Sequence, residues 1–177
     1  FEPTYRRGGE MMKYRIALMM TAVVILGYMP VADASAEEDT TSTKEQLLEK
    51  RMDYYIQHEN ILLPWYYLAA VDQYERNIQE VRKDIPKRES IIAIQFSDEF
   101  WSGILNPAEN DTSPVSIAYF NGSGMDGNGD GIADRSDDSD ILFTLAKYLR
   151  QYGYGEDNFK LALWDYYKNE LSVNQIL

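Results

Sequence analysis

The feature that most constrains this chain is an acidic, glycine-rich loop between Asp126 and Asp137. Oxygen-bearing side chains occupy its first, third, fifth, ninth and twelfth positions, and glycine occupies the sixth: Asp126, Asn128, Asp130, Asp134, Asp137 and Gly131. This order is typical of a twelve-residue calcium loop, in which the seventh residue, here Ile132, supplies its backbone carbonyl. The sequence therefore predicts a Ca²⁺ or Mg²⁺ site, although Asp137 replaces the usual glutamate. The alternative is a surface turn.

The loop leads directly into a predicted helix. Asp137 can cap this helix, and its third residue, Asp140, gives an acidic variant of the capping box. Apolar residues then recur at helical spacing, at positions 141, 142, 145, 146 and 149. No entering helix is recognisable before the loop. We therefore expect an EF-hand-like loop that clamps the start of one helix, and not a paired calcium sensor.

The N-terminal segment has the features of a secretory signal peptide. Lys13 and Arg15 precede an uncharged apolar run at 16–29, and small residues suited to cleavage follow at Ala34 and Ala36. We interpret 11–36 as the signal peptide of a secreted protein. An uncleaved anchor is the alternative, and it would be the protein's only contact with a membrane. Residues 1–10 are interpreted as a mistranslated leader and 37–43 as a disordered lead.

Charge and cysteine content narrow the possible partners. The chain has 29 acidic and 17 basic residues, a formal net charge of −12, and no cysteine. Such a charge disfavours binding to nucleic acid and to anionic lipid. Disulfides cannot stabilise the exported domain. A cation that binds only the folded state would do so instead.

Hydrophobic patterns predict a mainly helical domain over 44–177. Helices are expected at 45–59, at 65–83 after Pro64, over the segment that follows Asp137, at 157–169, and from about Ser172. The first of these carries Leu48, Met52, Tyr55 and Ile56 on one face. Two short apolar runs, 91–96 and 115–120, are interpreted as strands. The expected fold class is therefore mainly α, with an α+β character.

Glu75 is a candidate general acid. It follows Val71 by four residues and precedes Ile78 by three, so it lies on an apolar face of its helix, which Leu68 continues. A carboxyl group there loses hydration, which favours its protonated form. A protonated acid is what cleavage of a glycosidic bond requires. The alternative is a structural carboxylate that pairs with an arginine or caps a helix.

Three segments carry a resemblance to known cell-wall enzymes: 63–76, which contains Leu68-Ala-Ala-Val71 and Glu75; the 124–134 loop; and Leu163-Trp-Asp-Tyr-Tyr167. They resemble the lysozyme-like lytic transglycosylases and, more closely, the N-terminal region of secreted L-alanyl–D-glutamate peptidases of spore-forming bacteria. The resemblance implies a lysozyme-like fold over 44–177 and action on peptidoglycan in the cell wall or spore cortex. It also implies a lysostaphin-type zinc domain downstream of the residues in this chain.

The chain departs from these families in three places. His58 is its sole histidine, so these residues cannot supply the zinc ligands; we expect His58 on a helix surface. Arg76 follows Glu75, where active transglycosylases have serine or threonine. The segment that lines the sugar cleft of those enzymes would fall near 116–120, and it lacks their motif.

Three functions are therefore open. The first is a non-catalytic module that binds peptidoglycan through aromatic faces and presents a peptidase domain to the stem peptides; the candidate aromatics are Trp65, Tyr66, Trp101 and Tyr119, which could equally belong to the core. The second is an active glycosidase with Glu75 as acid and then base, assisted by the substrate's N-acetyl group. The third is a structural or partner-binding exported domain that docks through its tyrosine-rich first helix.

Overall fold

The computed structural model describes residues 34–59 and 63–177, with side chains from residue 43 onward. The interpreted leader at 1–10 and most of the interpreted signal peptide at 11–36 lie outside the described residues. The chain divides into two units, 1–43 and 44–177, and the second contains the folded domain. None of the helices in the described ranges has the length and hydropathy that a bilayer crossing requires.

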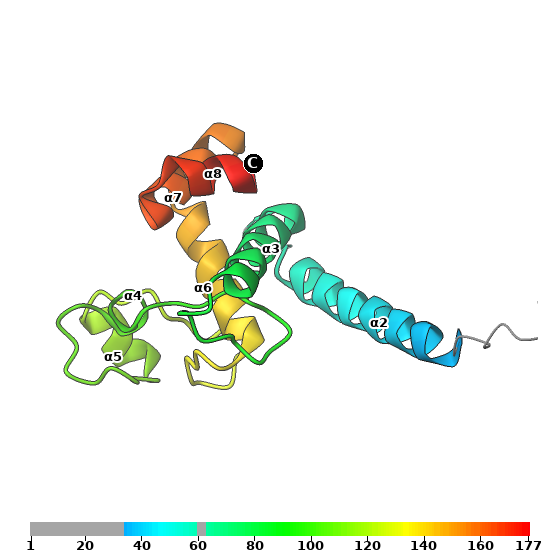
Figure 1. The fold of residues 1–177 in the computed structure, drawn as a ribbon. Coiled ribbons are helices and arrows are strands. Elements are labelled where there is room, and N and C mark those ends of the chain that lie inside the picture. The colour runs from blue at the N-terminus through cyan, green and yellow to red at the C-terminus, as the bar shows by residue number, and fades with distance from the viewer. Residues whose placement is uncertain (1–33, 60–62) are drawn as a thin grey trace, which may run out of the picture. The chain divides into compact units, whose positions relative to one another are not determined.

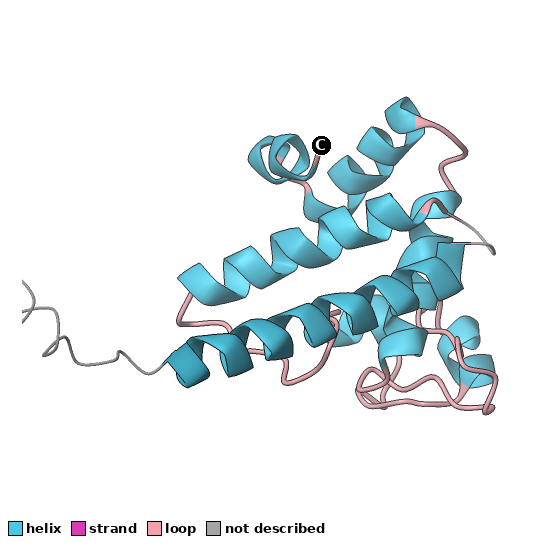
Figure 2. Ribbon diagram, turned by 90° about the vertical axis from the view of Figure 1, so that its right-hand side faces the viewer, coloured by secondary structure: helices cyan, strands magenta, loops and turns pink. Residues whose placement is uncertain are grey.

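Over the described ranges the chain forms seven helices and no strand (Figures 1 and 2). They are α2 (Ala34–Glu59), α3 (Trp65–Val81), α4 (Asp98–Ser102), α5 (Pro114–Tyr119), α6 (Asp138–Arg150), α7 (Glu156–Tyr167) and α8 (Glu170–Ile176). The predicted mainly helical class is confirmed, whereas both predicted strands are wrong. Because α2 begins at Ala34, residues 37–43 are helical in the structure, where a disordered lead was expected.

The 115–120 run is a helix because its start is capped. Ser113 accepts a hydrogen bond from the Ser116 N–H at 3.4 Å, and Pro114 occupies the first helical position. A serine cap followed by proline is a strong start signal for a helix. The alternation of apolar residues that suggested a strand leaves Ile117 buried and Val115 and Tyr119 exposed on this short helix.

The 91–96 run is buried but has no partner strand among the described residues. Side chains satisfy its backbone groups instead. The Ala93 N–H donates to Asp72 at 2.5 Å, and Gln79 donates to the Ala93 carbonyl at 2.5 Å. Arg88 donates to the Ile92 carbonyl at 2.8 Å. Buried backbone groups need partners, and here α3 supplies most of them in place of a β-ladder.

The core forms where α3, α6, α7 and α8 meet. Helix α6 contacts both α3 and α7, α8 contacts α7 and α3, and α4 contacts α5. These helices contribute fully buried side chains at their apolar positions: Leu68 and Val71 from α3, Leu142, Leu145 and Leu149 from α6, and Leu163 from α7. The predicted apolar stripes of α3 and α6 are therefore confirmed.

The residues of α2 that are buried are not the set that the sequence predicted. Tyr55 is buried, but Leu48, Met52 and Ile56, expected on the same face, are exposed. His58 was expected on a helix surface. It is only 2% exposed, and its Nδ1 donates to the Tyr54 carbonyl at 2.7 Å. The polar residues Tyr55 and His58 therefore take part in the packing of α2, and most of its predicted apolar stripe does not.

Candidate functional site

Glu75 is positioned by residues from three helices. The Tyr167 hydroxyl, at the end of α7, donates a hydrogen bond of 2.6 Å to Glu75 Oε1. Tyr74 of α3 packs edge-on against Tyr167, with ring centroids 5.2 Å apart. Its hydroxyl donates to Ser172 of α8 at 2.7 Å. The partner of Glu75 is thus a tyrosine, and neither an arginine nor a helix end.

The environment of Glu75 favours its protonated form. Burial raises the pKa of this carboxyl above its usual value, the hydrogen bond from Tyr167 opposes that effect, and the Asp72 carboxylate adds a smaller upward contribution. Burial also raises the pKa of the Tyr167 hydroxyl, and Glu75 raises it further, so this group stays a donor. A raised pKa suits a general acid, because the group keeps its proton to a higher pH than an ordinary carboxyl does.

Arg76, which follows Glu75, has a structural role. Its guanidinium pairs with Asp72 at 3.2 Å and donates to the Ile91 carbonyl at 2.8 Å. Asp72 is fully buried and also accepts from the Tyr55 hydroxyl at 2.6 Å. Arg76 therefore fixes the 91–93 backbone against α3, a task that serine or threonine at this position could not perform.

The segment beside the Glu75 helix is 91–96, and not 116–120. Residues 91 and 93 of this segment are bonded to α3. The segment also contacts α7, because the Gln95 carbonyl accepts a hydrogen bond from the Tyr166 hydroxyl at 3.4 Å. The Gln95 side chain donates to the Pro86 carbonyl at 3.0 Å. Residues 116–119 belong to α5, which contacts α4 and not α3. The segment that was expected to line a cleft beside Glu75 therefore does not contact the Glu75 helix.

The four candidate glycan-binding aromatics differ in exposure. Trp101 is 1% exposed, and a Cβ on Gly124 would lie 2.6 Å from its ring, so this indole is a core group and its expected stacking role is wrong. Trp65 is partly buried against the core. Tyr66 and Tyr119 are 51% and 79% exposed. These two remain available to a ligand.

The 126–137 loop is closed by its own hydrogen bonds. The two Asp126 carboxylate oxygens accept the N–H groups of Gly129 at 2.6 Å and Gly131 at 2.7 Å. The side chains of Asn128 and Asp130 each accept the N–H two residues further on, at 2.9 and 2.8 Å. These are Asx turns. Each oxygen keeps a further lone pair, so the bonds do not exhaust its capacity to ligate.

The described residues contain no group of three or more acidic, histidine or cysteine side chains arranged to hold a metal ion. Asp137, the expected twelfth ligand, caps α6 by accepting the N–H groups of Ser139 at 2.8 Å and Asp140 at 3.1 Å. The predicted cap is therefore confirmed. The donor set is all oxygen, as Ca²⁺ prefers, but its members do not converge, and the cation site stays a prediction.

Asp140 is the residue that organises this loop. It is fully buried, and its carboxylate accepts the N–H groups of Gly127 at 2.7 Å, Asn128 at 3.2 Å and Asp134 at 2.7 Å. Burial raises the pKa of Asp140, and these backbone bonds oppose the rise. The capping-box role expected for Asp140 is wrong, because its carboxylate bonds the loop while the Asp137 N–H donates to the Asp134 carbonyl.

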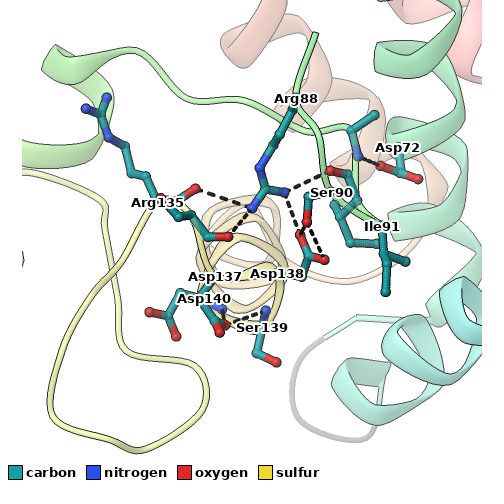
Figure 3. Close-up of polar contacts among 12 residues, drawn as sticks. Asp72, Arg88, Ser90, Ile91, Arg135, Asp137, Asp138, Ser139 and Asp140 are labelled. Atoms are coloured by element: carbon teal, nitrogen blue, oxygen red, sulfur yellow. Dashed lines mark hydrogen bonds and ion pairs between the residues drawn. The ribbon is translucent and has the colours of Figure 1, made fainter.

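Arg88 connects the start of α6 to the segment that lies on α3 (Figure 3). It forms a largely buried ion pair of 2.7 Å with Asp138, and it donates to the carbonyls of Ile92 at 2.8 Å and Ser136 at 2.9 Å. The Ser90 hydroxyl donates to the same Asp138 carboxylate at 2.7 Å. Sequence analysis did not single out Arg88, whose partners come from distant segments.

Comparison with known proteins places these features in context. Over 160 residues the chain is 42% identical to a protein of Bacillus subtilis (strain 168) named L-Ala–D-Glu endopeptidase. The two proteins are homologous. The match covers 90% of this chain and 48% of the endopeptidase, so the chain spans about half the length of that relative. No protein-family model matches the chain, and no solved structure matches it.

Proposed function

We propose that residues 44–177 form a peptidoglycan-binding module of a hydrolase of the L-Ala–D-Glu endopeptidase type. The observation that carries this proposal is the homology to the Bacillus endopeptidase over most of this chain. The module would act outside the cytoplasm, in remodelling of the bacterial cell wall or spore cortex. Its partner is peptidoglycan, which it would hold in position for the peptide-cleaving domain.

Binding, and not peptide cleavage, is the role assigned to these residues. The sole histidine of the chain, His58, is buried and bonded to a backbone carbonyl. A zinc peptidase site needs several protein ligands and an open coordination position, and the zinc is therefore assigned to a domain downstream. The exposed rings of Tyr66 and Tyr119 offer faces to a saccharide.

Sedimentation with insoluble peptidoglycan tests the proposal. The purified chain is mixed with sacculi stripped of secondary polymers, and the bound fraction is measured at low and moderate salt. We expect retention that persists at moderate salt, with cellulose as the control polysaccharide. If none of the chain is retained on peptidoglycan at low salt, the proposal is contradicted. Cross-linking to a protein, with no glycan retention, would favour a partner-binding domain instead.

A second function is favoured by the geometry of Glu75. In this alternative, its partly buried carboxyl protonates the glycosidic oxygen and the resulting carboxylate then acts as base, while Tyr167 holds it in place. Zymography on peptidoglycan compares the wild-type chain with Glu75→Gln. A lytic band that is lost in the variant would support this function, and bands of equal strength would exclude Glu75 as the acid.

We also propose that Ca²⁺, or Mg²⁺ in its place, binds the 126–137 loop and stabilises the module. Support comes from the order of oxygen donors in the sequence and from the free lone pairs on Asp126, Asn128 and Asp130. Binding would require these side chains to turn toward one point. The cation would then add to the hydrogen bonds that already close the loop.

A further inference from the structure

An uncharged aromatic pocket lies where the start of α3 meets the turn between α6 and α7. The groups around this cavity of about 270 Å³ are aromatic, aliphatic or glycine, and they include Pro64, Tyr66, Tyr67, Leu149, Tyr154 and Phe159. No acidic or basic side chain lines it, in a chain of net charge −12. The volume is just below the roughly 300–1,000 Å³ of pockets that enclose drug-sized ligands. This Tyr66–Tyr154 pocket therefore suits one ring of a larger molecule.

One wall of the pocket is an exposed ring that is held in place. Tyr154 is 78% exposed, yet the Arg150 guanidinium lies over its ring. Asn158 donates to the Tyr154 carbonyl at 2.7 Å. Gly153 has a φ of +108°, and a Cβ there would lie 2.8 Å from the Asn158 side chain. The turn is thus fixed on both sides of Tyr154, and its ring loses little freedom when a ligand binds.

The other wall is a set of aromatic rings packed against one another at tilted angles. Tyr66 is 51% exposed and packs on Tyr67, with ring centroids 4.6 Å apart. Tyr67 packs on the buried Phe159 at 3.9 Å. Two exposed, well-supported rings that border one uncharged cavity mark a ligand site more readily than isolated surface aromatics do.

We propose that the Tyr66–Tyr154 pocket binds an N-acetylated pyranose ring of a glycan strand. A pyranose presents an apolar C–H face that packs on an aromatic ring, and its hydroxyl edge can meet the tyrosine hydroxyls and water. It is neutral, as the pocket is. The stem peptides carry carboxylates, which a chain of net charge −12 repels. Arg150, the cation beside the pocket, lies over the Tyr154 ring. The inference rests on the proposed function and names the part of peptidoglycan that is recognised.

This assignment is tested by isothermal titration calorimetry, in which the full chain is titrated with the tetramer of N-acetylglucosamine. We expect Tyr154→Ala and Tyr66→Ala each to weaken binding about tenfold or more. Tyr154→Phe keeps the ring and should stay within about threefold of wild type. Trp164→Ala removes an exposed aromatic of α7 outside the pocket and should bind as wild type does. Circular dichroism of each variant verifies that it is folded.

The same variants are also tested for retention on peptidoglycan, which separates the two proposals. Retention of wild type without any tetramer binding would overturn the pocket assignment and leave the proposed function standing. So would unchanged tetramer binding in folded Tyr154→Ala and Tyr66→Ala. Tetramer binding that both substitutions weaken, with no retention on peptidoglycan, would support the pocket and contradict the proposed function.

Discussion

Tyr167 and Glu75 lie 92 positions apart in the sequence and share a hydrogen bond of 2.6 Å. The bond joins the last residue of α7 to the middle of α3, where Glu75 is partly buried. A neutral carboxyl and a carboxylate can both accept from the tyrosine hydroxyl. The protonation state of Glu75 should therefore affect both stability and any chemistry at this site.

Glu75→Gln should change how stability depends on pH. The folded-state pKa of Glu75 is raised above its usual value of 4.5, so the folded state binds this proton more tightly than the unfolded state does. The contribution of Glu75 to the free energy of unfolding should then fall as the pH rises from about 4.5 through the folded-state pKa. The glutamine variant lacks this decline. Urea unfolding from pH 4 to 8 measures the difference, and parallel curves for the two proteins would contradict the assignment.

Tyr167→Phe should destabilise the domain at neutral pH. The substitution leaves the partly buried Glu75 carboxyl in place without its donor. An unsatisfied buried acceptor costs about 1–3 kcal/mol, and a partly buried one should cost the lower part of that range. Tyr166→Phe is a matched control, because its hydroxyl makes only a 3.4 Å contact with the Gln95 carbonyl. Chemical unfolding at pH 7 should show the larger loss for Tyr167→Phe. Equal losses would mean that the Glu75 contact contributes no special stability.

Asp140→Ala should cost far more than Asp137→Ala. Removal of Asp140 leaves three backbone N–H groups of the loop without their acceptor, with an expected loss of about 3 kcal/mol or more. Removal of Asp137 takes away a helix cap, which costs about 1 kcal/mol. Denaturant unfolding of the two variants gives the comparison. A reversed order would show that Asp140 does not organise the loop.

Calcium should raise the melting temperature if the 126–137 loop ligates it. A ligand at one hundred times its Kd stabilises the folded state by about 2.7 kcal/mol. Asp126→Asn together with Asp130→Asn should abolish the effect. The change at Asp130 keeps the oxygen that accepts from the Ile132 N–H, whereas the change at Asp126 keeps one of the two oxygens that accept from Gly129 and Gly131. Thermal melts with added Ca²⁺, added Mg²⁺ and added chelator provide the readout. A melting temperature indifferent to all three would rule out the cation.

The helices with strong local signals were predictable from sequence. Pro64 and Asp137 mark the starts of α3 and α6, and apolar residues at helical spacing follow each of them. The same kind of signal, Ser113 followed by Pro114, precedes 115–120, but the apolar alternation of this run is also typical of a strand. Residues 91–96 have the apolar, β-branched composition of a strand, and Ile92 and Ile94 are fully buried. Their backbone partners are side chains from α3, which no local pattern reveals.

The candidate site was predictable only in part. The apolar face of α3 indicated a carboxyl group with reduced hydration at Glu75, and this group is partly buried in the structure. Its partner Tyr167 was not predictable, because the contact joins two helices far apart in the sequence. Composition also could not separate Trp101, which is buried, from Tyr66, which is exposed. The position of Asp140 in the first turn of α6 is typical of a capping residue, and no local pattern reveals that its carboxylate accepts three N–H groups of the loop.

The convergence of three loop N–H groups on Asp140 has a kinetic consequence. Gly127, Asn128 and Asp134 exchange their amide hydrogens only when they leave a carboxylate that sits in the first turn of α6. Loop and helix should consequently open as one cooperative unit, with common protection factors for these three amides and for the early amides of α6. An apparently mobile glycine-rich turn would then exchange as slowly as the helix that anchors it.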